Sequence, residues 1–412
     1  MFQTIRPAIP VLIAIALIEA GIGLLNPLIS IQLEARGISS FLIGFTSSAY
    51  SIGFLLGSLY GHKIIDRVGH IRALSVFAVL MADSILLHVI FGHPSIWLVL
   101  RVIQGYASAG AYLVIESWLN DKARPEIRGR IFGIYTGISW GMSGLSPLLF
   151  NIVAPTGPLF FVVATIFMAT SLISMALTKV GNPEITQRRH IGILRLFKIS
   201  PLAVICCFGA GFLNGALFAL LPVYTASIGL EVHQLSILIS MTTWAAAGQF
   251  FIGHLADKYG RRPIIITTTA MAMVFAFSLY ILPSISFIIL LILFFLMLVA
   301  ETPLYALGVG QMTDYVEKQE FVAASSGLLF SWGIGAAIGP GIFGFTMDYL
   351  GGHSLFLMMS IGFAIITCFA IYRAMRRHAK DPLDQSHFVA QPISLSQGTG
   401  TAGAPELDPR RE

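Results

Sequence analysis

Apolar runs of about 20 residues follow one another along most of the chain, and they constrain the fold more than any other feature. A run of this length crosses a bilayer as one α-helix, because all of its backbone polar groups are then paired within the segment. Of the 412 residues, 56% are hydrophobic and 11% are charged, and the mean hydropathy is +0.82. Soluble domains carry about 25% charged residues. The chain is therefore predicted to be an all-α membrane protein.

Twelve transmembrane helices are predicted. The first run could be mistaken for a signal peptide, but it is long, lacks a small-residue cleavage site and is followed by eleven further runs. The cysteines lie in apolar runs without disulfide-type or CxxC spacing, so we expect no metal site. The helices are predicted to be centred near Glu19, Ser51, Met81, Ser108, Ser139, Met168, Ala210, Thr243, Met271, Val299, Gly333 and Gly362.

The distribution of cations predicts the orientation. All but two of the 25 Lys and Arg residues fall on the side of the membrane that holds both termini. The exceptions are Arg36, in the loop after the first helix, and Arg101, inside the fourth. The positive-inside rule then predicts that both termini lie in the cytoplasm. The membrane is expected to be the inner (plasma) membrane of the cell. The basic pI of about 9.1 is thus explained by topology, and we expect no nucleic-acid partner.

The two halves of the chain repeat. HKIIDRVGHIR after the second helix matches GHLADKYGRR after the eighth, and the paired residues are Asp66 with Asp257 and Gly69 with Gly260. We expect an N-terminal six-helix bundle over 1–178, a cytoplasmic linker over 179–200, a C-terminal bundle over 201–377 and a disordered cytoplasmic tail over 378–412. Parallel repeats are typical of secondary transporters, whose site lies between the halves. Further matched pairs are Pro27 with Pro222, Asp121 with Asp314 and Pro147 with Pro340.

Two motifs resemble those of a known family. GHLADKYGRR resembles the loop signature of the major facilitator superfamily, and LVLRVIQGYASAG resembles its helix 4 signature. The resemblance covers residues 5 to about 377 and is greatest to the bacterial drug and proton antiporter branch and its uncharacterised relatives. It implies a fold of two pseudo-symmetric six-helix bundles, with helices 1, 4, 7 and 10 lining a cavity. The first-half loop departs from the signature at His62 and His70, and GISWGMSGLSP in helix 5 departs from the antiporter signature.

Charged residues at membrane depth are informative because each costs about 2.5 to 3.5 kcal/mol to insert. Glu19 and Asn26 fall on one stripe of helix 1, and Arg101, Gln104 and Tyr112 on one stripe of helix 4. Asn214, which aligns with Glu19 across the repeat, is expected to be either a cavity ligand or an interhelical hydrogen-bonding residue. The predicted substrate-binding residues are Glu19, Asn26, Arg101, Gln104, Tyr112, Asn214, Trp244, Glu301 and Trp332.

Three carboxyls are candidates for proton coupling. Glu19 is favoured as the proton carrier, since a carboxyl near the midplane is penalised for being charged unless water or Arg101 approaches. The alternative is a Glu19 fixed by a hydrogen bond to Asn26 or by a pair with Arg101. Glu301 is the next candidate for the proton carrier. The alternative is that Glu301 belongs to a hydrogen-bond network at the helix kink caused by Pro303. Asp83 is expected to turn toward Arg101 or to remain protonated.

A gating cluster is predicted at the cytoplasmic loops. We place Asp66 at the amino end of helix 3, where it faces a helix dipole and could pair with Arg67 and Glu116 to latch the two halves. Asp257 is its counterpart in the second half. The alternative is a solvated loop that only satisfies the positive-inside bias.

The favoured function is secondary active transport of a small organic molecule by alternating access, with proton-coupled export of a drug or metabolite. A proton-coupled importer of a small organic anion held by Arg101, or a non-transporting membrane sensor, remains open. The sequence contains neither HExxH nor a nucleotide-binding glycine loop. We therefore expect that the protein is not an enzyme and binds no cofactor. The expected partners are a small-molecule substrate, protons and the lipid bilayer, and the chain is expected to be a monomer. About half of a set of aromatic residues should face the cavity: Tyr112, Trp140, Tyr224, Trp244, Tyr305 and Trp332.

Overall fold

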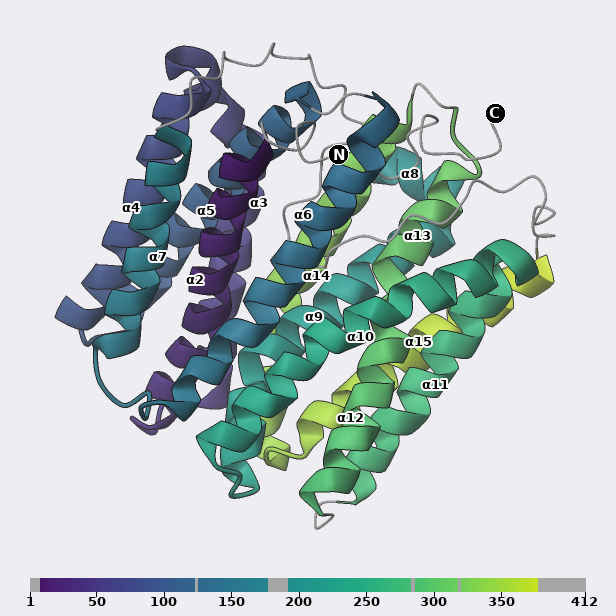
Figure 1. Cartoon of the computed structure of the whole chain (residues 1–412). Coiled ribbons are helices and arrows are strands. Elements are labelled where there is room, and N and C mark those ends of the chain that lie inside the picture. The colour runs from purple at the N-terminus through teal and green to yellow at the C-terminus, as the bar shows by residue number, and fades with distance from the viewer. Residues whose placement is uncertain (1–7, 123–124, 177–191, 283–285, 318–319, 377–412) are drawn as a thin grey trace.

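A computed structural model describes residues 8–122, 125–176, 192–282, 286–317 and 320–376. Over these ranges the chain consists of helices joined by short turns (Figure 1). Ten of the described helices are long and apolar enough to cross a membrane. With α6 and the shorter apolar helix α7, they occupy all twelve predicted positions. The predicted all-helical membrane fold is confirmed.

The first bundle contains the helices up to residue 176. A short 3-10 helix, η2, continues α6. The elements are α2 (Ile9–Glu34), α3 (Ser40–Val68), α4 (His70–Ile90), α5 (Pro94–Lys122), α6 (Pro125–Leu145), η2 (Ser146–Asn151) and α7 (Leu159–Ala176).

The second bundle repeats this arrangement. Its fourth span is broken at Pro303, which has no N–H to continue the helix, and so it consists of two helices, α12 and α13. The elements are α9 (Pro201–Ser227), α10 (Val232–Tyr259), α11 (Arg261–Ile281), α12 (Phe287–Glu301), α13 (Leu304–Thr313), α14 (Phe321–Leu350) and α15 (Ser354–Arg376).

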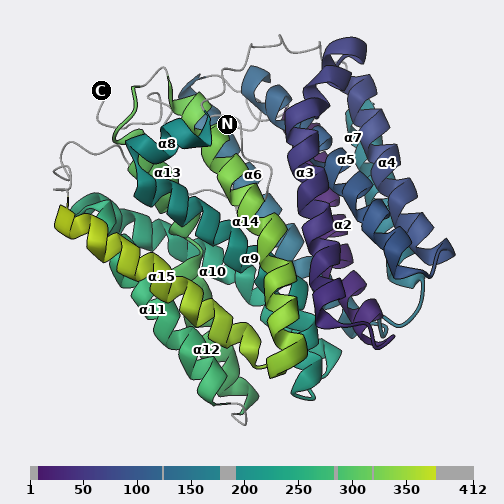
Figure 2. The same cartoon turned by 180° about the vertical axis from the view of Figure 1, so that it is seen from behind.

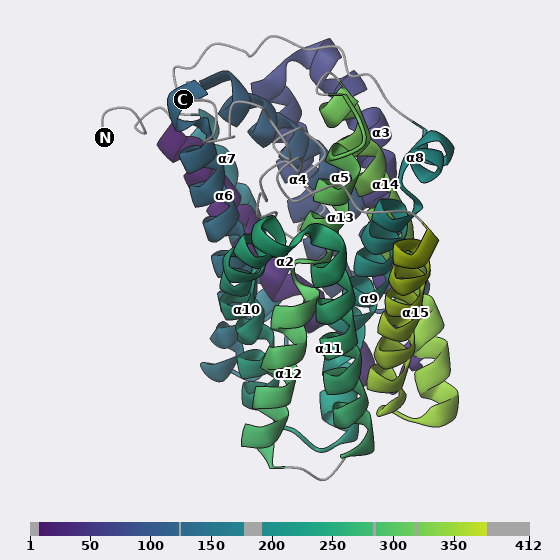
Figure 3. The same cartoon turned by 90° about the vertical axis from the view of Figure 1, so that its right-hand side faces the viewer.

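The segment between the bundles contains a short helix, α8 (Ile193–Ile199), which packs against α9 and α14 (Figure 3). It falls within the linker predicted over 179–200. The rest of that linker up to residue 191 and the tail predicted over 378–412 lie outside the described residues.

The loop repeat found in the sequence forms the same turn in both halves. Gly69 ends α3 with a φ of 80°, and Gly260 ends α10 with a φ of 88°. Only glycine adopts such angles without strain, so it can cap one helix and start the next immediately. The turn joins α3 to α4 in one bundle and α10 to α11 in the other.

The two sides of the molecule are named here by their chain segments. The terminal face carries the first residues of α2 and the last residues of α15, and the far face carries the turn at residues 35–39 between α2 and α3. The terminal face is uppermost in Figures 1 and 2.

The bundles meet near the far face. The backbone N–H groups of Ser40 and Phe41, at the start of α3, donate to the Asp348 carboxylate of α14 at 2.7 and 3.0 Å. A carboxylate at a helix N-terminus is favoured by the helix dipole and by the unpaired N–H groups there. Ser30 of α2 donates to the Ala219 carbonyl of α9 at 2.8 Å. The same side holds Ser236 donating to Asn151 at 2.9 Å and Thr243 donating to the Trp140 carbonyl at 3.0 Å.

Toward the terminal face the bundles diverge. Helices α6 and α10 are joined near the far face and separate on the way to the terminal face (Figure 1). Helices α3 and α14 show the same arrangement from behind (Figure 2). Their close approach depends on glycines, because a side chain at Gly44 would collide with the Pro340 carbonyl and one at Gly344 with the Ser40 carbonyl. The molecule is therefore closed at the far face.

Candidate functional site

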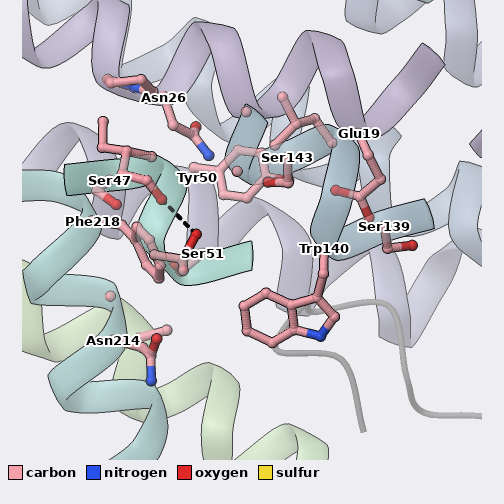
Figure 4. Close-up of a pocket in the computed structure, with 18 of the residues that line it drawn as sticks. Glu19, Asn26, Ser47, Tyr50, Ser51, Ser139, Trp140, Ser143, Asn214 and Phe218 are labelled. Atoms are coloured by element: carbon pink, nitrogen blue, oxygen red, sulfur yellow. Dashed lines mark hydrogen bonds between the residues drawn. The ribbon is translucent and has the colours of Figure 1, made fainter. Parts of the chain in front are cut away.

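A cavity with about 1080 Å³ of empty space, part of it open solvent, lies between the bundles. It is lined by α2, α3, α5 and α6 of the first bundle and by α9, α10 and α14 of the second (Figure 4). The expectation that helix 10 lines the cavity is corrected, because no residue of α12 or α13 is among its lining residues.

Glu19 is positioned by α2 in the wall of this cavity, where it is 2% exposed. The Tyr112 hydroxyl on α5 donates a hydrogen bond to Glu19 Oε1 at 3.0 Å. Ser139 of α6 lies beside the carboxyl group (Figure 4). Gly23, one turn along α2, permits this contact with α6, since a Cβ there would overlap the Ser143 carbonyl. Glu19 thus lies where α2, α5 and α6 meet.

Arg101 lines the same cavity and is also 2% exposed. Its guanidinium donates to Asn26 Oδ1 at 2.9 Å, to Gln104 Oε1 at 2.7 Å and to the Thr46 carbonyl at 3.4 Å. It also lies over the Tyr50 ring, 4.4 Å from the centroid. All of these partners are neutral, and within the described residues no carboxylate forms an ion pair with Arg101.

Glu19 and Arg101 therefore share a cavity without pairing with each other. Asn26 binds Arg101 rather than Glu19, so neither of the fixed arrangements considered for Glu19 is present. A guanidinium has five N–H donors, and Arg101 uses three of them on protein acceptors. The site combines a carboxyl that can gain or lose a proton with a cation whose charge is not neutralised locally.

Asn214 contributes from the second bundle. It lines the cavity, and its side-chain amide donates to Glu301 Oε1 at 2.9 Å. Glu301 is 2% exposed, in the last turn of α12, and is not a lining residue. Gln104 likewise reaches the cavity only through Arg101.

The aromatic residues divide into two groups. Tyr112, Trp140 and Trp332 line the cavity. Trp244 is 61% exposed on the outside of α10, which corrects its predicted place in the cavity. The two remaining candidates, Tyr224 and Tyr305, are buried elsewhere.

Asp83 lies on the outer surface of α4, where it is exposed between Val79 and Leu86. The prediction that it turns toward Arg101 is therefore corrected. A side chain on a helix faces either a neighbouring helix or the outer surface of the bundle. Because Ala82 and Ser84 pack against neighbouring helices, Asp83 between them faces the outer surface.

The predicted gating residues are spread over three helices. Asp66 and Arg67 are exposed in the last turn of α3, so the prediction that Asp66 begins the next helix is wrong, and no side chain caps α4. Glu116 is buried in α5 and accepts a hydrogen bond from the Tyr135 hydroxyl at 3.4 Å. Asp257 is half-buried in the last turn of α10.

A buried ion pair stands at the second loop repeat. Arg261, the first residue of α11, pairs with Asp314 at the end of α13 and donates to the Gly310 carbonyl at 2.6 Å. At the matching place in the first bundle, His70 contacts Ser117 at 3.1 Å. The sequence signal for this pair is the match of Asp314 with Asp121 together with the basic residues that follow Gly260.

Several lining residues were not predicted. They come from α3, α6, α9 and α10, and most are small polar or apolar side chains that no motif distinguishes from packing residues. They include Ser47, Tyr50, Ser51, Ser139, Ser143, Phe218, Ile239 and Thr242.

Comparisons with known proteins identify similar chains. The family model described as Major Facilitator Superfamily matches residues 11–246 and 203–399. A protein of Salmonella paratyphi A described as "Uncharacterized MFS-type transporter YcaD" is 27% identical over 367 residues, which cover 87% of this chain and 94% of the relative.

Solved structures share the fold at low identity. The nucleoside transporter NupG aligns with a TM-score of 0.74 at 14% identity, covering 92% of this chain and 100% of its own. A bacterial homolog of the human lysosomal transporter Spinster, in an inward-facing and occupied conformation, aligns with a TM-score of 0.71 at 14% identity, covering 91% and 97%.

Proposed function

The chain belongs to the Major Facilitator Superfamily and is a secondary transporter, and we propose that it couples the movement of a small organic molecule to the movement of protons. In this proposal the cavity between the bundles is the substrate site and Glu19 is the proton carrier. The favoured direction is export, in exchange for protons.

The distribution of Lys and Arg supports a cytoplasmic location for both termini, in the inner membrane of a bacterial cell. With that orientation the terminal face is cytoplasmic. The bundles are joined at the far face and diverge toward the terminal face, so the structure corresponds to the inward-facing state of an alternating-access cycle.

One observation carries the proposal for Glu19: its carboxyl group lies in the cavity wall with a tyrosine hydroxyl, and not a cation, as its partner. A buried carboxylate without a cation is disfavoured, so a closed cavity without cargo favours the protonated form, whereas a cationic cargo beside Glu19 favours the carboxylate and releases its proton. Water entry stabilises the anion. The occupancy of one group by a proton thus depends on what fills the cavity, which is the requirement for coupling.

Exchange follows from competition within the cavity. A cationic amphipathic molecule packed against Trp140 and Trp332 would pair with the Glu19 carboxylate, and the proton that Glu19 held would leave to the cytoplasm. Its release toward the outside, followed by protonation of Glu19 from that side, would return the carrier with a proton. The inward proton gradient would then drive export.

The test replaces Glu19 by Gln, which has nearly the same volume and mimics the neutral acid. A thermal-shift screen over lipophilic cations, neutral drugs and organic anions first supplies a ligand for the wild-type protein. In proteoliposomes, Glu19→Gln should still exchange this ligand across the membrane but should no longer concentrate it in response to a pH gradient. Concentration at the wild-type level would exclude Glu19 as the carrier.

A second candidate function, proton-coupled import of a small organic anion, is favoured by the absence of a carboxylate partner for Arg101 among the described residues. When Glu19 is protonated, the cavity wall has a net positive charge because of Arg101, and this charge attracts an anion. When Glu19 is ionised, the two charges offset each other. A proton and an anion would therefore bind together and move in the same direction.

The same proteoliposomes separate the two candidates. Under exchange, acidifying the side opposite to the ligand drives its accumulation there. Under co-transport, acidifying the side that holds the ligand drives it across. The outcome is read from the direction of ligand flux in the wild-type protein, with Glu19→Gln as the uncoupled control.

A further inference from the structure

A second buried carboxyl, Glu301, lies in the other bundle and outside the cavity. It stands in the middle of the span Phe287–Thr313, at the last residue of α12 before the break at Pro303. Its Oε1 accepts the hydrogen bond from Asn214, while its Oε2 is buried without a partner in the part of the chain that is described. A carboxyl group at this depth with one unpaired oxygen calls for a ligand.

The repeat places a tyrosine near Glu301 at the position that Tyr112 has in the first bundle, although Glu301 itself aligns with Ser108. Tyr305 and Tyr112 are 193 positions apart, the same spacing as Asp314 and Asp121. In the first bundle the Tyr112 hydroxyl donates to Glu19, but the Tyr305 hydroxyl is buried with no partner recorded over the described ranges. The two tyrosines thus occupy matching positions, and only the hydroxyl of Tyr112 is bonded to the carboxyl group under discussion in its bundle.

Within the described residues no charged side chain contacts Glu301, and the carboxyl that acts on the neighbouring Tyr305 is Glu116 of α5. Asn214 and the thiol of Cys207 reach this region from α9, and Tyr305 from α13. The titratable residues of α10 and α11 lie near their ends: His233, His254, Asp257, Lys258 and Tyr259 on α10, and Arg261, Arg262 and Tyr280 on α11. Within the described chain Glu301 forms no ion pair.

We propose that Glu301 is a second proton-binding site, which belongs to the C-terminal bundle and is linked to the cavity through Asn214. The ligand is a proton rather than a metal cation. A hard cation requires several oxygen ligands, whereas the unpaired oxygen of this carboxyl group within the described residues is Oε2 of Glu301. A proton needs only this one oxygen.

The link through Asn214 gives the site a role in transport. Figure 4 shows the Asn214 amide nitrogen directed away from the other labelled side chains of the cavity, and this nitrogen donates to Glu301. An ionised Glu301 holds this orientation strongly, because hydrogen bonds to charged acceptors are stronger. Protonation weakens the hold and allows Asn214 to turn a donor toward cargo. The transporter then carries two titratable carboxyls, one in each bundle.

Infrared difference spectroscopy tests the proposal without a known substrate. The full-length protein in phosphatidylcholine vesicles is taken from acidic to alkaline pH, and the loss of the protonated carboxyl C=O band is recorded. Two components are expected in the wild-type protein, one absent in Glu19→Gln and the other absent in Glu301→Gln. A wild-type band that Glu301→Gln leaves unchanged would overturn the proposal.

Two further variants keep the test decisive if Glu301→Gln does not fold. Asn214→Leu removes the donor to Oε1, so it should shift the Glu301 component to higher frequency and leave the Glu19 component in place. Tyr112→Phe is the matched control and should shift only the Glu19 component. An Asn214→Leu protein with neither component shifted contradicts the proposal, as does a band that sodium chloride removes at constant acidic pH.

The infrared band and the transport assay together distinguish the proposal for Glu301 from the proposal that Glu19 is the proton carrier. Loss of coupling in Glu19→Gln with two infrared components in the wild type supports both. If Glu19→Gln remains fully coupled while Glu301→Gln loses its component, the Glu19 proposal fails and the Glu301 site stands.

Discussion

Arg101 is a buried cation held by neutral groups. Its contacts with Asn26, Gln104 and the Thr46 carbonyl use the planar fork of the guanidinium, which a lysine ammonium cannot reproduce. Leaving such a charge without a carboxylate in a low-dielectric cavity is costly, and the cost is offset when an anion binds. The residue is therefore the observation that favours the second candidate function, import of an anion.

Matched aromatic probes test this indication through the tryptophan fluorescence of Trp140 and Trp332, which line the cavity. At acidic pH the wild-type protein should bind 2-naphthoate more tightly than the neutral 2-naphthamide. A charge-assisted hydrogen bond contributes about 1.5 to 3 kcal/mol, so the preference should be roughly tenfold or greater. Arg101→Gln should abolish it, and Arg101→Lys should retain a small part of it.

The control for this measurement is Asp83→Asn, because Asp83 is exposed on the outer surface of α4. It should leave both affinities unchanged. Should Arg101→Gln keep the preference for 2-naphthoate, Arg101 has a structural role and import of an anion is not supported.

Helices α3 and α14 form the contact that closes the far face. The Asp348 carboxylate of α14 accepts two backbone N–H groups at the start of α3 and so acts as an N-cap supplied by the other bundle. An N-cap contributes about 0.5 to 2 kcal/mol. Because Asp348 is exposed, the lower part of that range applies. Even so, such an energy can shift the balance between two conformations several-fold.

Asp348→Ala is therefore expected to populate the state that is open at the far face. Spin labels at the far-face ends of α5 and α14, on the exposed residues Ile96 and Tyr349, should show a longer distance component in double electron–electron resonance. The matched control is Gly133→Ala on α6, where an added Cβ meets nothing within 4 Å. An unchanged distance distribution in Asp348→Ala would show that the N-cap is not part of the closure.

The whole molecule is expected to alternate between this state and one closed at the terminal face. In the present state Asp66 and Arg67 are exposed at the end of α3, on the side where the bundles diverge. The predicted latch between the halves would then form only in the other state, when the terminal-face ends of α3 and α14 approach each other.

Asp66→Asn should impair counterflow in proteoliposomes while membrane abundance stays normal, because the outward-facing state loses a charged contact. Asp257→Asn, its counterpart, is expected to have a smaller effect. Counterflow at the wild-type rate with normal abundance would exclude the latch. A larger defect in Asp257→Asn would indicate that the second-half loop carries the contact, in keeping with the buried Arg261–Asp314 pair beside it.

The spans, their number and the repeat of the halves could be predicted from the sequence. Hydropathy is a property of consecutive residues in one helix, and a helix in a bilayer satisfies its backbone without a partner. The turn glycines Gly69 and Gly260 were found for the same reason, since the left-handed conformation is a local requirement. The depth of Glu19, Arg101 and Glu301 followed from their places along the runs.

The partners of these residues depended on packing between helices that are distant in the sequence. A helix can rotate about its axis without any change in hydropathy, and this rotation placed Trp140 in the cavity and Trp244 and Asp83 outside. It also paired Glu19 with Tyr112 and Arg101 with Asn26, although the sequence had shown only that these four residues lie on two helical stripes. Such choices are made by van der Waals contacts and interhelical hydrogen bonds in the assembled bundle, because lipid provides no hydrophobic force that would fix which face of a helix turns inward.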